Sequence, residues 1–286
     1  MDRDSKKLLH KVVVDLICLG SVGFSVLMFY IYGSPYERGF FCGDESIRYP
    51  FKESTVSSFI LHLIGLGLPT LVIIFIEFSM RNNEQSRYSI LGTNIPNWLY
   101  SVYNNLLWFL FGAACSQLTT DIGKYTIGRL RPHFLDICKP DVDCNADINK
   151  TKYIENFKCT GEMSKKFKDS RLSFPSGHSS LSFYCMVYLA LYLQARIKTS
   201  KYGIPKSFFQ FLVIVMAAYC ALSRISDYKH HWSDVLAGTL LGITVATLTA
   251  LYVTDLFAAK YKSLRKRNSS TGDIETTNNL QTTELK

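Results

Sequence analysis

The sequence predicts an all-α membrane protein with six transmembrane helices packed in a helical bundle. The first observation is composition, because 48% of the 286 residues are hydrophobic and only 19% are charged. That charged share is below the roughly 25% that is usual for soluble domains. The second observation is arrangement, because the apolar residues gather in long blocks without a charged side chain. Crossing a bilayer takes roughly 20 apolar residues, and each block is about that long.

Six such blocks follow one another along the chain. A large soluble protein with buried helices is the alternative, but soluble helices carry polar stripes that these blocks mostly lack. A basic segment precedes the first block as in a signal peptide, yet the block is too long for one and no small-residue cleavage site follows. We therefore interpret it as an uncleaved span. The predicted spans are 16–33, 54–76, 98–120, 177–195, 207–223 and 235–254.

The net charge of +9 does not indicate nucleic acid as a partner, because the basic residues lie beside the ends of the blocks. The positive-inside rule places both termini and the 196–206 loop in the cytoplasm. Residues 1–11 are then a cytoplasmic segment, 12–258 the six-span domain and 259–286 a cytoplasmic tail, disordered beyond its basic start. That basic start is expected to lie near anionic cytoplasmic lipids and comprises Lys260, Lys262, Arg265, Lys266 and Arg267.

The first chemically informative segment follows the third span. Lys124 and Arg131 are seven residues apart, which is about two turns if the helix continues, so both cations would point the same way. Pro132 is expected to end the helix at Arg131. Gly123 and Gly128 would allow close approach of a neighbouring backbone or ligand. The segment predicts an anion clamp, although a solvated basic helix end has the same residues.

The second segment, Pro175-Ser176-Gly177-His178, opens the fourth span. Ser176 is a typical helix cap, and the N–H groups of Gly177 and His178 would then be free at the positive end of the helix dipole. Such a helix start binds anions. A capping serine beside an interfacial histidine is the alternative interpretation.

The third segment places Arg224 at the end of the fifth span and His230 and Asp234 at the start of the sixth. If the chain is helical there, His230 and Asp234 are neighbours at i and i+4. A carboxylate on one ring nitrogen would leave the other nitrogen as a nucleophile or base. His231, at i and i+3 from Asp234, competes for the same role, and spacing along the helix leaves both histidines open.

The three segments are expected on one side of the membrane, where they would combine cations, a helix start, two histidines and a carboxylate. That set suits phosphate, which cations and N–H groups bind and a histidine can attack. No paired carboxylates for Mg²⁺ and no cysteine–histidine spacing typical of zinc occur in these motifs, so neither a metal nor another cofactor is predicted.

The pattern K-x6-RP, PSGH and SR-x5-H-x3-D resembles the phosphatidic acid phosphatase type 2/haloperoxidase superfamily. Segments such as FGAACSQLTTDIGKYTIGRLRPHFLDIC and LSRISDYKHHWSDVLAG closely resemble the animal lipid phosphate phosphatases, and the resemblance covers roughly residues 8–258. It implies the helical bundle of that superfamily and hydrolysis of phosphatidic acid, lysophosphatidic acid, sphingosine-1-phosphate and ceramide-1-phosphate at the plasma membrane. Relatives also self-associate, so a homo-oligomer is an expectation.

The resemblance also implies a role for each motif residue. His230, rather than His231, matches the nucleophile that becomes a phosphohistidine, and Asp234 orients it. His178 protonates the leaving alkoxide and later activates water. The phosphate oxygens would be held by Lys124, Arg131, Arg224, Ser176 and the N–H of Gly177. A catalytically silent lipid-binding protein is the alternative, but the chain keeps every motif residue.

The loop over 121–176 carries two further expectations on the outer side. Asn149-Lys150-Thr151 is an acceptor for N-glycosylation, and we expect a glycan on Asn149 but none on Asn268 in the cytoplasmic tail. Disulfides persist on that side of a membrane, so some of the cysteines in the outer loops are expected to pair. Three complete pairings are possible among Cys42, Cys138, Cys144 and Cys159.

Overall fold

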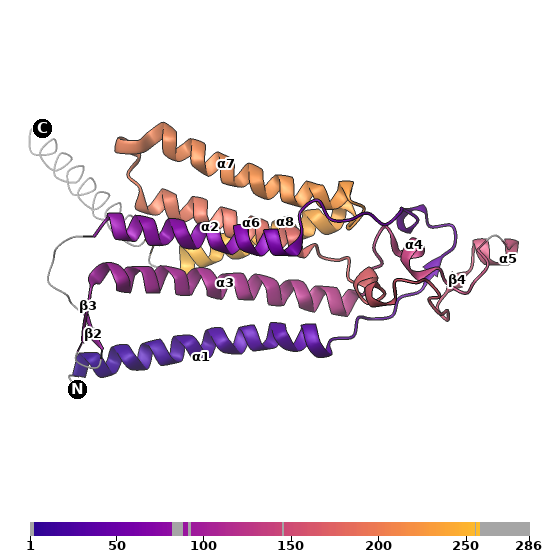
Figure 1. The fold of residues 1–286 in the computed structure, drawn as a ribbon, viewed down its shortest axis with the longest axis horizontal. Helices are drawn as coiled ribbons and strands as arrows, with labels where there is room; N and C mark the ends of the chain where they lie inside the picture. Colours follow the sequence, from indigo (N-terminus) through magenta and orange to yellow (C-terminus); the bar gives the residue numbers. More distant parts are fainter. Residues whose placement is uncertain (1–2, 82–87, 91–92, 145, 255, 258–286) are drawn as a thin grey trace, which may run out of the picture.

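The structure, a computed structural model, describes residues 3–81, 88–90, 93–144, 146–254 and 256–257. Each of the six apolar blocks forms a long helix, and these helices run side by side (Figure 1). The last of them continues as a π-helical turn over Thr249–Val253. The basic start of the tail lies outside the described residues. The long helices are α1 (Arg3–Tyr32), α2 (Ser58–Ser79), α3 (Asn97–Ile127), α6 (Gly177–Arg196), α7 (Thr199–Ser226) and α8 (Trp232–Leu248).

Within the described ranges, four helices are long and apolar enough to cross a membrane, namely Ser5–Tyr32, Ser58–Ser79, Tyr202–Ser226 and Trp232–Val253. They belong to α1, α2, α7 and α8, and they indicate a membrane protein. Helices α3 and α6 are less apolar because they carry polar residues on faces that the bundle buries. In α6, for example, Ser179, Ser180 and Tyr184 are all buried. The count of six spans therefore stays a prediction.

Helix α6 lies at the centre of the bundle and contacts α2, α3, α7 and α8, whereas the peripheral α1 packs mainly against α3. Two glycines let α8 approach α6 closely. A Cβ on Gly238 would lie 2.4 Å from the Ser176 carbonyl oxygen, and one on Gly242 would lie 2.3 Å from that of Ser180. This contact sets the start of α8 directly against the start of α6.

The other end of α6 is held by a buried carboxylate. Glu77 of α2 is only 2% exposed, and it forms an ion pair with Arg196 of α6. The Tyr192 hydroxyl donates to Glu77 at 2.7 Å, and the Asn105 amide of α3 donates at 3.1 Å. These contacts bind three helices together at the end away from the motif segments.

The long loops form a compact cap at one end of the bundle, shown at the right of Figure 1. Strand β1 (Phe40–Phe41) pairs antiparallel with β4 (Tyr153–Ile154) around a small apolar cluster. Disulfides join Cys42 to Cys144 and Cys138 to Cys159, which confirms that these cysteines pair and selects one of the three pairings. The remaining cap elements are α4 (Phe134–Cys138), α5 (Asp147–Lys150) and 3-10 turns over Glu45–Ile47, Ser164–Lys166 and Asp169–Arg171.

The opposite end of the bundle carries a short antiparallel hairpin of β2 (Tyr88–Ile90) and β3 (Thr93–Ile95). The hairpin lies beside the start of α1 (Figure 1). Its Tyr88 ring stacks on Tyr100 of α3 at 3.9 Å, which anchors the hairpin to the bundle.

Candidate active site

The first motif segment does not form one continuous helix. Helix α3 ends at Ile127, and Gly128 takes the left-handed conformation with φ of 57°. A Cβ on Gly128 would lie 2.0 Å from the Tyr36 carbonyl oxygen, so close backbone packing requires glycine there. The helix therefore ends one turn earlier than Pro132 predicted. Arg131 lies in the following loop rather than two helical turns above Lys124.

Lys124 nevertheless reaches the second motif segment. A Cβ on Gly177 would lie 3.1 Å from the Lys124 Nζ, so the ammonium group lies against the first residue of α6. Gly123 allows this approach, because a Cβ there would lie 2.8 Å from the Pro175 ring. The end of α3 and the start of α6 are therefore in direct contact, as the close approach expected of Gly123 requires.

Ser176 caps α6, as predicted. Its backbone is extended, and its hydroxyl accepts hydrogen bonds from the Ser179 backbone N–H at 3.4 Å and the Ser179 hydroxyl at 3.0 Å. Its own N–H donates to the Asp234 carbonyl at 3.0 Å, which joins the second segment to the third. In the described part of the chain, the N–H groups of Gly177 and His178 have no hydrogen-bond acceptor. They remain available to an anion at the helix start.

His178 lies on the first turn of α6, next to Gly177. Its Nε2 is 3.2 Å from the Val56 carbonyl oxygen, in the segment that leads into α2. His230 and the three predicted clamp cations all lie within electrostatic range of the imidazole. The structure thus gathers these residues from three segments that are about 50 residues apart in the chain. The three cations are Lys124, Arg131 and Arg224.

Two of those cations are held by carboxylates that the sequence analysis did not single out. Arg131 Nη2 lies 2.7 Å from Asp169 Oδ1, and Arg224 Nη2 lies 2.7 Å from Asp227 Oδ2. Asp227 also accepts hydrogen bonds from the Thr55 N–H and hydroxyl at 2.8 and 2.7 Å. Each guanidinium has five N–H donors, so one such pair orients the group and leaves donors for a ligand.

Asp169 remains ionised beside Arg131. Partial desolvation would raise the pKa of the Asp169 carboxyl, whose side chain is largely exposed, but the charges nearby, Arg131 and Lys124 first among them, hold the pKa below its ordinary value. Because the carboxylate keeps its charge, it can hold the Arg131 guanidinium in place. The signal that could have identified Asp169 is its position in the long outer loop shortly before PSGH, but an acidic loop residue is too common to be specific.

The third motif segment departs from the expected helical spacing. Helix α8 begins at Trp232 with His231 as its cap, so His230 precedes the helix and is not at an i, i+4 position within it. His230 Nδ1 is 3.8 Å from Asp234 Oδ2 and instead lies 2.7 Å from the Ser173 carbonyl oxygen. That carbonyl can only accept a hydrogen bond, so Nδ1 carries the proton and Nε2 is the free nitrogen. The orienting role of Asp234 stays a prediction, and the structure adds the Ser173 carbonyl as a second partner of the His230 ring.

Asp234 is closer to the competing histidine. Its Oδ2 lies 3.2 Å from His231 Nδ1 and accepts the His231 N–H at 3.0 Å. The two rings have different surroundings, however. His230 is 3% exposed and lies within electrostatic range of Arg131 and Lys124. His231 lines a separate cavity of about 410 Å³ with Arg38 and residues of the cap.

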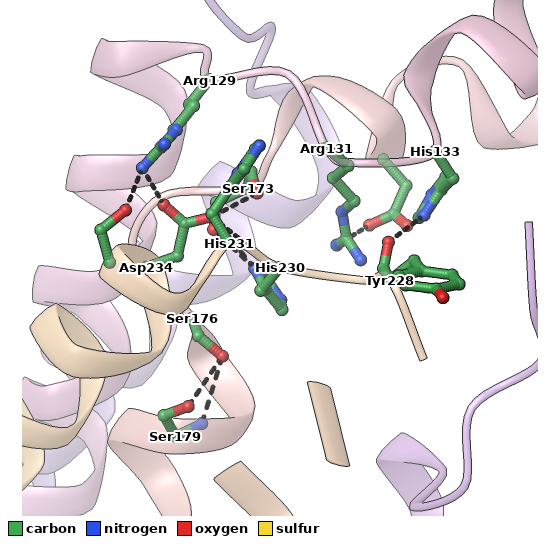
Figure 2. A network of polar contacts seen from close by, with 12 residues as sticks. Arg129, Arg131, His133, Ser173, Ser176, Ser179, Tyr228, His230, His231 and Asp234 are labelled. Atoms are coloured by element: carbon green, nitrogen blue, oxygen red, sulfur yellow. Dashed lines mark hydrogen bonds and ion pairs between the residues drawn. The ribbon is translucent and has the colours of Figure 1, made fainter. Parts of the chain in front are cut away.

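Two further residues complete the surroundings of Asp234 (Figure 2). Arg129 Nη1 lies 2.6 Å from Asp234 Oδ1 and also donates to the Ser233 hydroxyl at 2.8 Å. The Ser173 hydroxyl donates to Asp234 Oδ2 at 2.6 Å. Ser173 therefore contacts both Asp234 and His230. Neither Arg129 nor Ser173 was predicted from the sequence, because only their position within or beside a motif distinguishes them.

Burial shifts the protonation of the site histidines. It lowers the pKa of His230 to about 4, and Arg131 and Lys124 act in the same direction while Asp234 opposes them. Burial also lowers the pKa of His133 to about 4, and His133 Nδ1 lies 2.7 Å from the Tyr228 carbonyl oxygen (Figure 2). Both rings are therefore neutral near pH 7. Neutral His230 has the lone pair on Nε2 that a nucleophile requires.

Two other sequence predictions have a place in the structure. Asn149 lies in α5 of the cap, at its far end from the bundle in Figure 1, and its amide donates to the Asp143 carbonyl at 2.8 Å. Asn268 lies outside the described residues. Among the described residues, no group of three or more His, Cys, Asp or Glu side chains is arranged to hold a metal ion.

Comparison with known proteins supports the motif assignment. Residues 105–258 match the family model described as the PAP2 superfamily. The chain is 43% identical over 280 residues to phospholipid phosphatase 1 of Rattus norvegicus, which covers 96% of this chain and 95% of the relative. It is 40% identical over 260 residues to phospholipid phosphatase 2 of Homo sapiens, covering 87% and 84%. No solved structure matches. Since the family match contains every motif residue and the similarity to the relatives spans most of both chains, this protein belongs to the PAP2 superfamily.

Proposed function

We propose that this protein is an integral-membrane phosphatase that hydrolyses lipid phosphate monoesters to a neutral lipid and inorganic phosphate. The relatives are named phospholipid phosphatases, which supports a lipid phosphate as the substrate class. The proposed substrates are phosphatidic acid, lysophosphatidic acid, sphingosine-1-phosphate and ceramide-1-phosphate. One observation carries the proposal. Neutral His230, with Nδ1 on the Ser173 carbonyl, lies near Arg131 and Lys124. His178, at the start of α6, lies near the same two cations and Arg224.

The first chemical step would form a phosphohistidine. Lys124, Arg131 and Arg224 hold the phosphate oxygens, with the N–H of Gly177 and the Ser176 cap at the helix start. The His230 Nε2 lone pair forms the P–N bond while the P–O bond to the lipid breaks. His178 donates a proton to the leaving alkoxide, so that a neutral lipid alcohol departs. Asp234 stabilises the positive charge that develops on His230 at a distance of 3.8 Å.

The second step would restore the enzyme. His178, now neutral, takes a proton from water, and the water oxygen attacks phosphorus as the P–N bond breaks. Inorganic phosphate leaves, and His230 regains its neutral form. Preorganised cations and N–H groups meet the negative charge on phosphorus in both steps. We therefore expect turnover without a metal ion.

The active site is proposed to face the cell exterior or the lumen, with both termini in the cytoplasm and six helices spanning the membrane. The two cap disulfides support this orientation, because disulfides persist in oxidising compartments. The motif segments lie at the same end of the bundle as this cap. The enzyme would then act at the plasma membrane on lipids of the outer leaflet. Self-association and a tail bound to anionic lipids stay predictions.

Two other functions fit parts of the molecule. A catalytically silent lipid-binding protein would need the bundle alone, and a phosphatase for soluble phosphate esters would use the same motifs. Phosphate release by the purified protein distinguishes them, measured with the four lipids, a sugar phosphate, excess chelator and vanadate. We expect lipid turnover that chelator leaves intact and vanadate inhibits. No release from any substrate would contradict an enzyme, and strict Mg²⁺ dependence would contradict the proposed chemistry.

A further inference from the structure

A second cavity, of about 360 Å³, lies within the helical bundle rather than in the cap. Four helices line it, namely α1, α2, α3 and α6, and the lining is mostly apolar. We name this cavity the bundle slot. Its polar residues are His62 and Gln117, and the rest of its wall consists of Leu19, Gly23, Val26, Leu66, Leu110, Ala113, Ala114 and Leu181.

The bundle slot exists because α1 stands apart from part of the bundle. Helix α1 packs mainly against α3, and its Asp15 accepts a hydrogen bond from the Tyr103 hydroxyl at 2.8 Å. Further along α1, Gly23 lines the slot, and a Cβ added there would meet no atom within 4 Å. Small residues on α3, Ala113 and Ala114, widen the opposite wall. The space is therefore open beside α1.

On α3 and α6, the two helices that it shares with the proposed phosphate site, the slot is lined by residues further from the cap. Gln117 is seven residues before Lys124 on α3, which is about 10.5 Å along the helix axis. Leu181 is three residues after His178 on α6, or about 4.5 Å. Both steps lead away from the cap into the bundle. The Gln117 amide donates to both Asp121 oxygens at 3.0 Å, so the polar corner of the slot lies on the side of the phosphate site.

We propose that the bundle slot binds a hydrocarbon chain of the lipid substrate while its phosphate lies among Lys124, Arg131 and His178. This inference rests on the proposed function, because it assigns a place to the tail of the substrate whose head group that function assigns. The polar-to-apolar order along α3 and α6 matches the order of a lipid phosphate. Its phosphate would lie at the helix ends, its polar linkage near Gln117 and its chain against Gly23 and Leu66.

The slot would contribute by positioning the substrate, not by the free energy of transferring its hydrocarbon chain out of water. A chain that leaves the surrounding lipid for the slot exchanges one apolar environment for another, so little free energy is gained from burial. Holding the chain orients the phosphorus toward His230, and a misplacement of about 1 Å can lower a rate by about a hundredfold. Blocking the slot should therefore affect only substrates whose chains are long enough to enter it.

The test introduces bulk at Gly23 and uses a neighbouring glycine as its matched control. Gly23→Phe places a ring in the slot, whereas Gly20→Phe adds the same ring to the same helix outside it, at a position where a Cβ also meets no atom within 4 Å. The purified full-length variants are assayed with long-chain phosphatidic acid in mixed micelles and with a water-soluble phosphatidic acid whose chains are too short for the slot. Turnover of the soluble substrate also shows that each variant is folded.

We expect Gly23→Phe to lower kcat/KM for the long-chain substrate by about tenfold to a hundredfold and to leave the short-chain value within about twofold of the unmodified protein. Gly20→Phe should match the unmodified protein with both. An equal loss from both variants, a loss with both substrates, or no loss from Gly23→Phe would each overturn the slot assignment. Failure of the unmodified protein to release phosphate from either lipid would instead overturn the proposed function.

Discussion

His230 is held by a backbone carbonyl and not by a carboxylate alone. The Ser173 carbonyl at 2.7 Å sets the tautomer, while the Ser173 hydroxyl binds Asp234 at 2.6 Å. One residue of the loop before PSGH thus connects the proposed nucleophile to the buried carboxylate. Arg129 holds the other oxygen of that carboxylate at 2.6 Å. At the residue scale, the proposed chemistry depends on this network as well as on the motif residues (Figure 2).

Substitution of the two adjacent histidines tests which one is the nucleophile. His230→Ala should abolish turnover because it removes the ring that lies near Lys124, Arg131 and His178. His231→Ala should retain much of the activity, since His231 faces the cap cavity. Phosphate release from both variants and mass spectrometry of trapped phosphoenzyme provide the measurements. An equal loss from both substitutions, or phosphate found on His231, would show the assignment to be wrong.

Arg129 is expected to be a positioning residue. Arg129→Ala leaves one oxygen of the buried Asp234 without its partner, so the carboxylate should shift and the His230 ring with it. We expect kcat to fall by about tenfold to a hundredfold with KM within about twofold, because Arg129 binds Asp234 and not the phosphate. Arg129→Lys should recover part of kcat. A change in KM alone would indicate that Arg129 binds the substrate instead.

The pH dependence should follow the burial of His230. His230 attacks only when neutral, and its pKa of about 4 keeps it neutral down to that pH, whereas an ordinary histidine with a pKa of 6.5 would protonate earlier. The profile of kcat/KM should fall at low pH as His230 becomes protonated. The profile of kcat should be bell-shaped, because His178 must be protonated to donate while the phosphate, whose negative charge favours the protonated imidazole, is bound. The acid limb assigned to His230 should lie near pH 4, after correction for the ionisation of the substrate. A limb at pH 6.5 would contradict the buried, neutral ring, and a flat profile would contradict both proton roles.

At the scale of elements, the bundle is built around α6. Gly238 and Gly242 allow α8 to lie against the start and second turn of α6, and Lys124 of α3 reaches the same start through Gly177. The proposed site therefore forms where three helices meet. The other end of α6 is held by Glu77, whose carboxylate binds Arg196, Tyr192 and Asn105. The site and this buried ion pair lie at opposite ends of one helix.

Removing Glu77 should lower stability without changing the chemistry. Glu77→Ala removes the shared partner of Arg196, Tyr192 and Asn105, and leaving such a polar group unpaired costs about 1 to 3 kcal/mol. The midpoint of thermal denaturation in detergent should fall accordingly. Activity at low temperature should stay close to that of the unmodified protein, because α6 separates the two regions by about 30 Å. Glu77→Gln, which can still hydrogen-bond to Tyr192, should show a smaller fall. A large loss of kcat at low temperature would contradict this separation.

At the scale of the whole molecule, the cap distinguishes the two ends of the bundle. It contains both disulfides, the β1–β4 pair and the loop that carries Asn149. The opposite end carries the β2–β3 hairpin and the start of α1. Because the motif segments lie at the cap end, the side of the membrane that the cap occupies determines which lipids the enzyme can reach.

Glycosylation shows directly which side of the membrane the cap occupies. We expect a glycan on Asn149 and none on Asn268, because only the first acceptor would lie outside the cytoplasm. Asn149→Gln should abolish a mobility shift that is sensitive to endoglycosidase and should leave activity largely intact, since α5 is at the far end of the cap. Asn268→Gln should change nothing. A glycan on Asn268 would invert the topology and place the site in the cytosol.

The sequence by itself determined the six long helices, the start of α6 and the residues that gather at the site. These features depend on short stretches of chain. A block of about 20 apolar residues that crosses a bilayer forms a helix because its backbone hydrogen bonds must be satisfied within the block. Ser176 caps α6 through an N–H only three residues away. The motif residues were identifiable because their types and spacing match a known family. The roles of those residues remain proposals.

Only the tertiary structure decided the contacts between segments that are distant in the chain. Gly128 ends α3 early because Tyr36 packs against it. His230 hydrogen-bonds to the Ser173 carbonyl because α8 begins only at Trp232, so that His230 is not aligned with Asp234 on one helix. The pairing of Cys42 with Cys144 joins residues 102 apart. Such contacts depend on how whole helices and loops pack together, and no local pattern of residues records that packing.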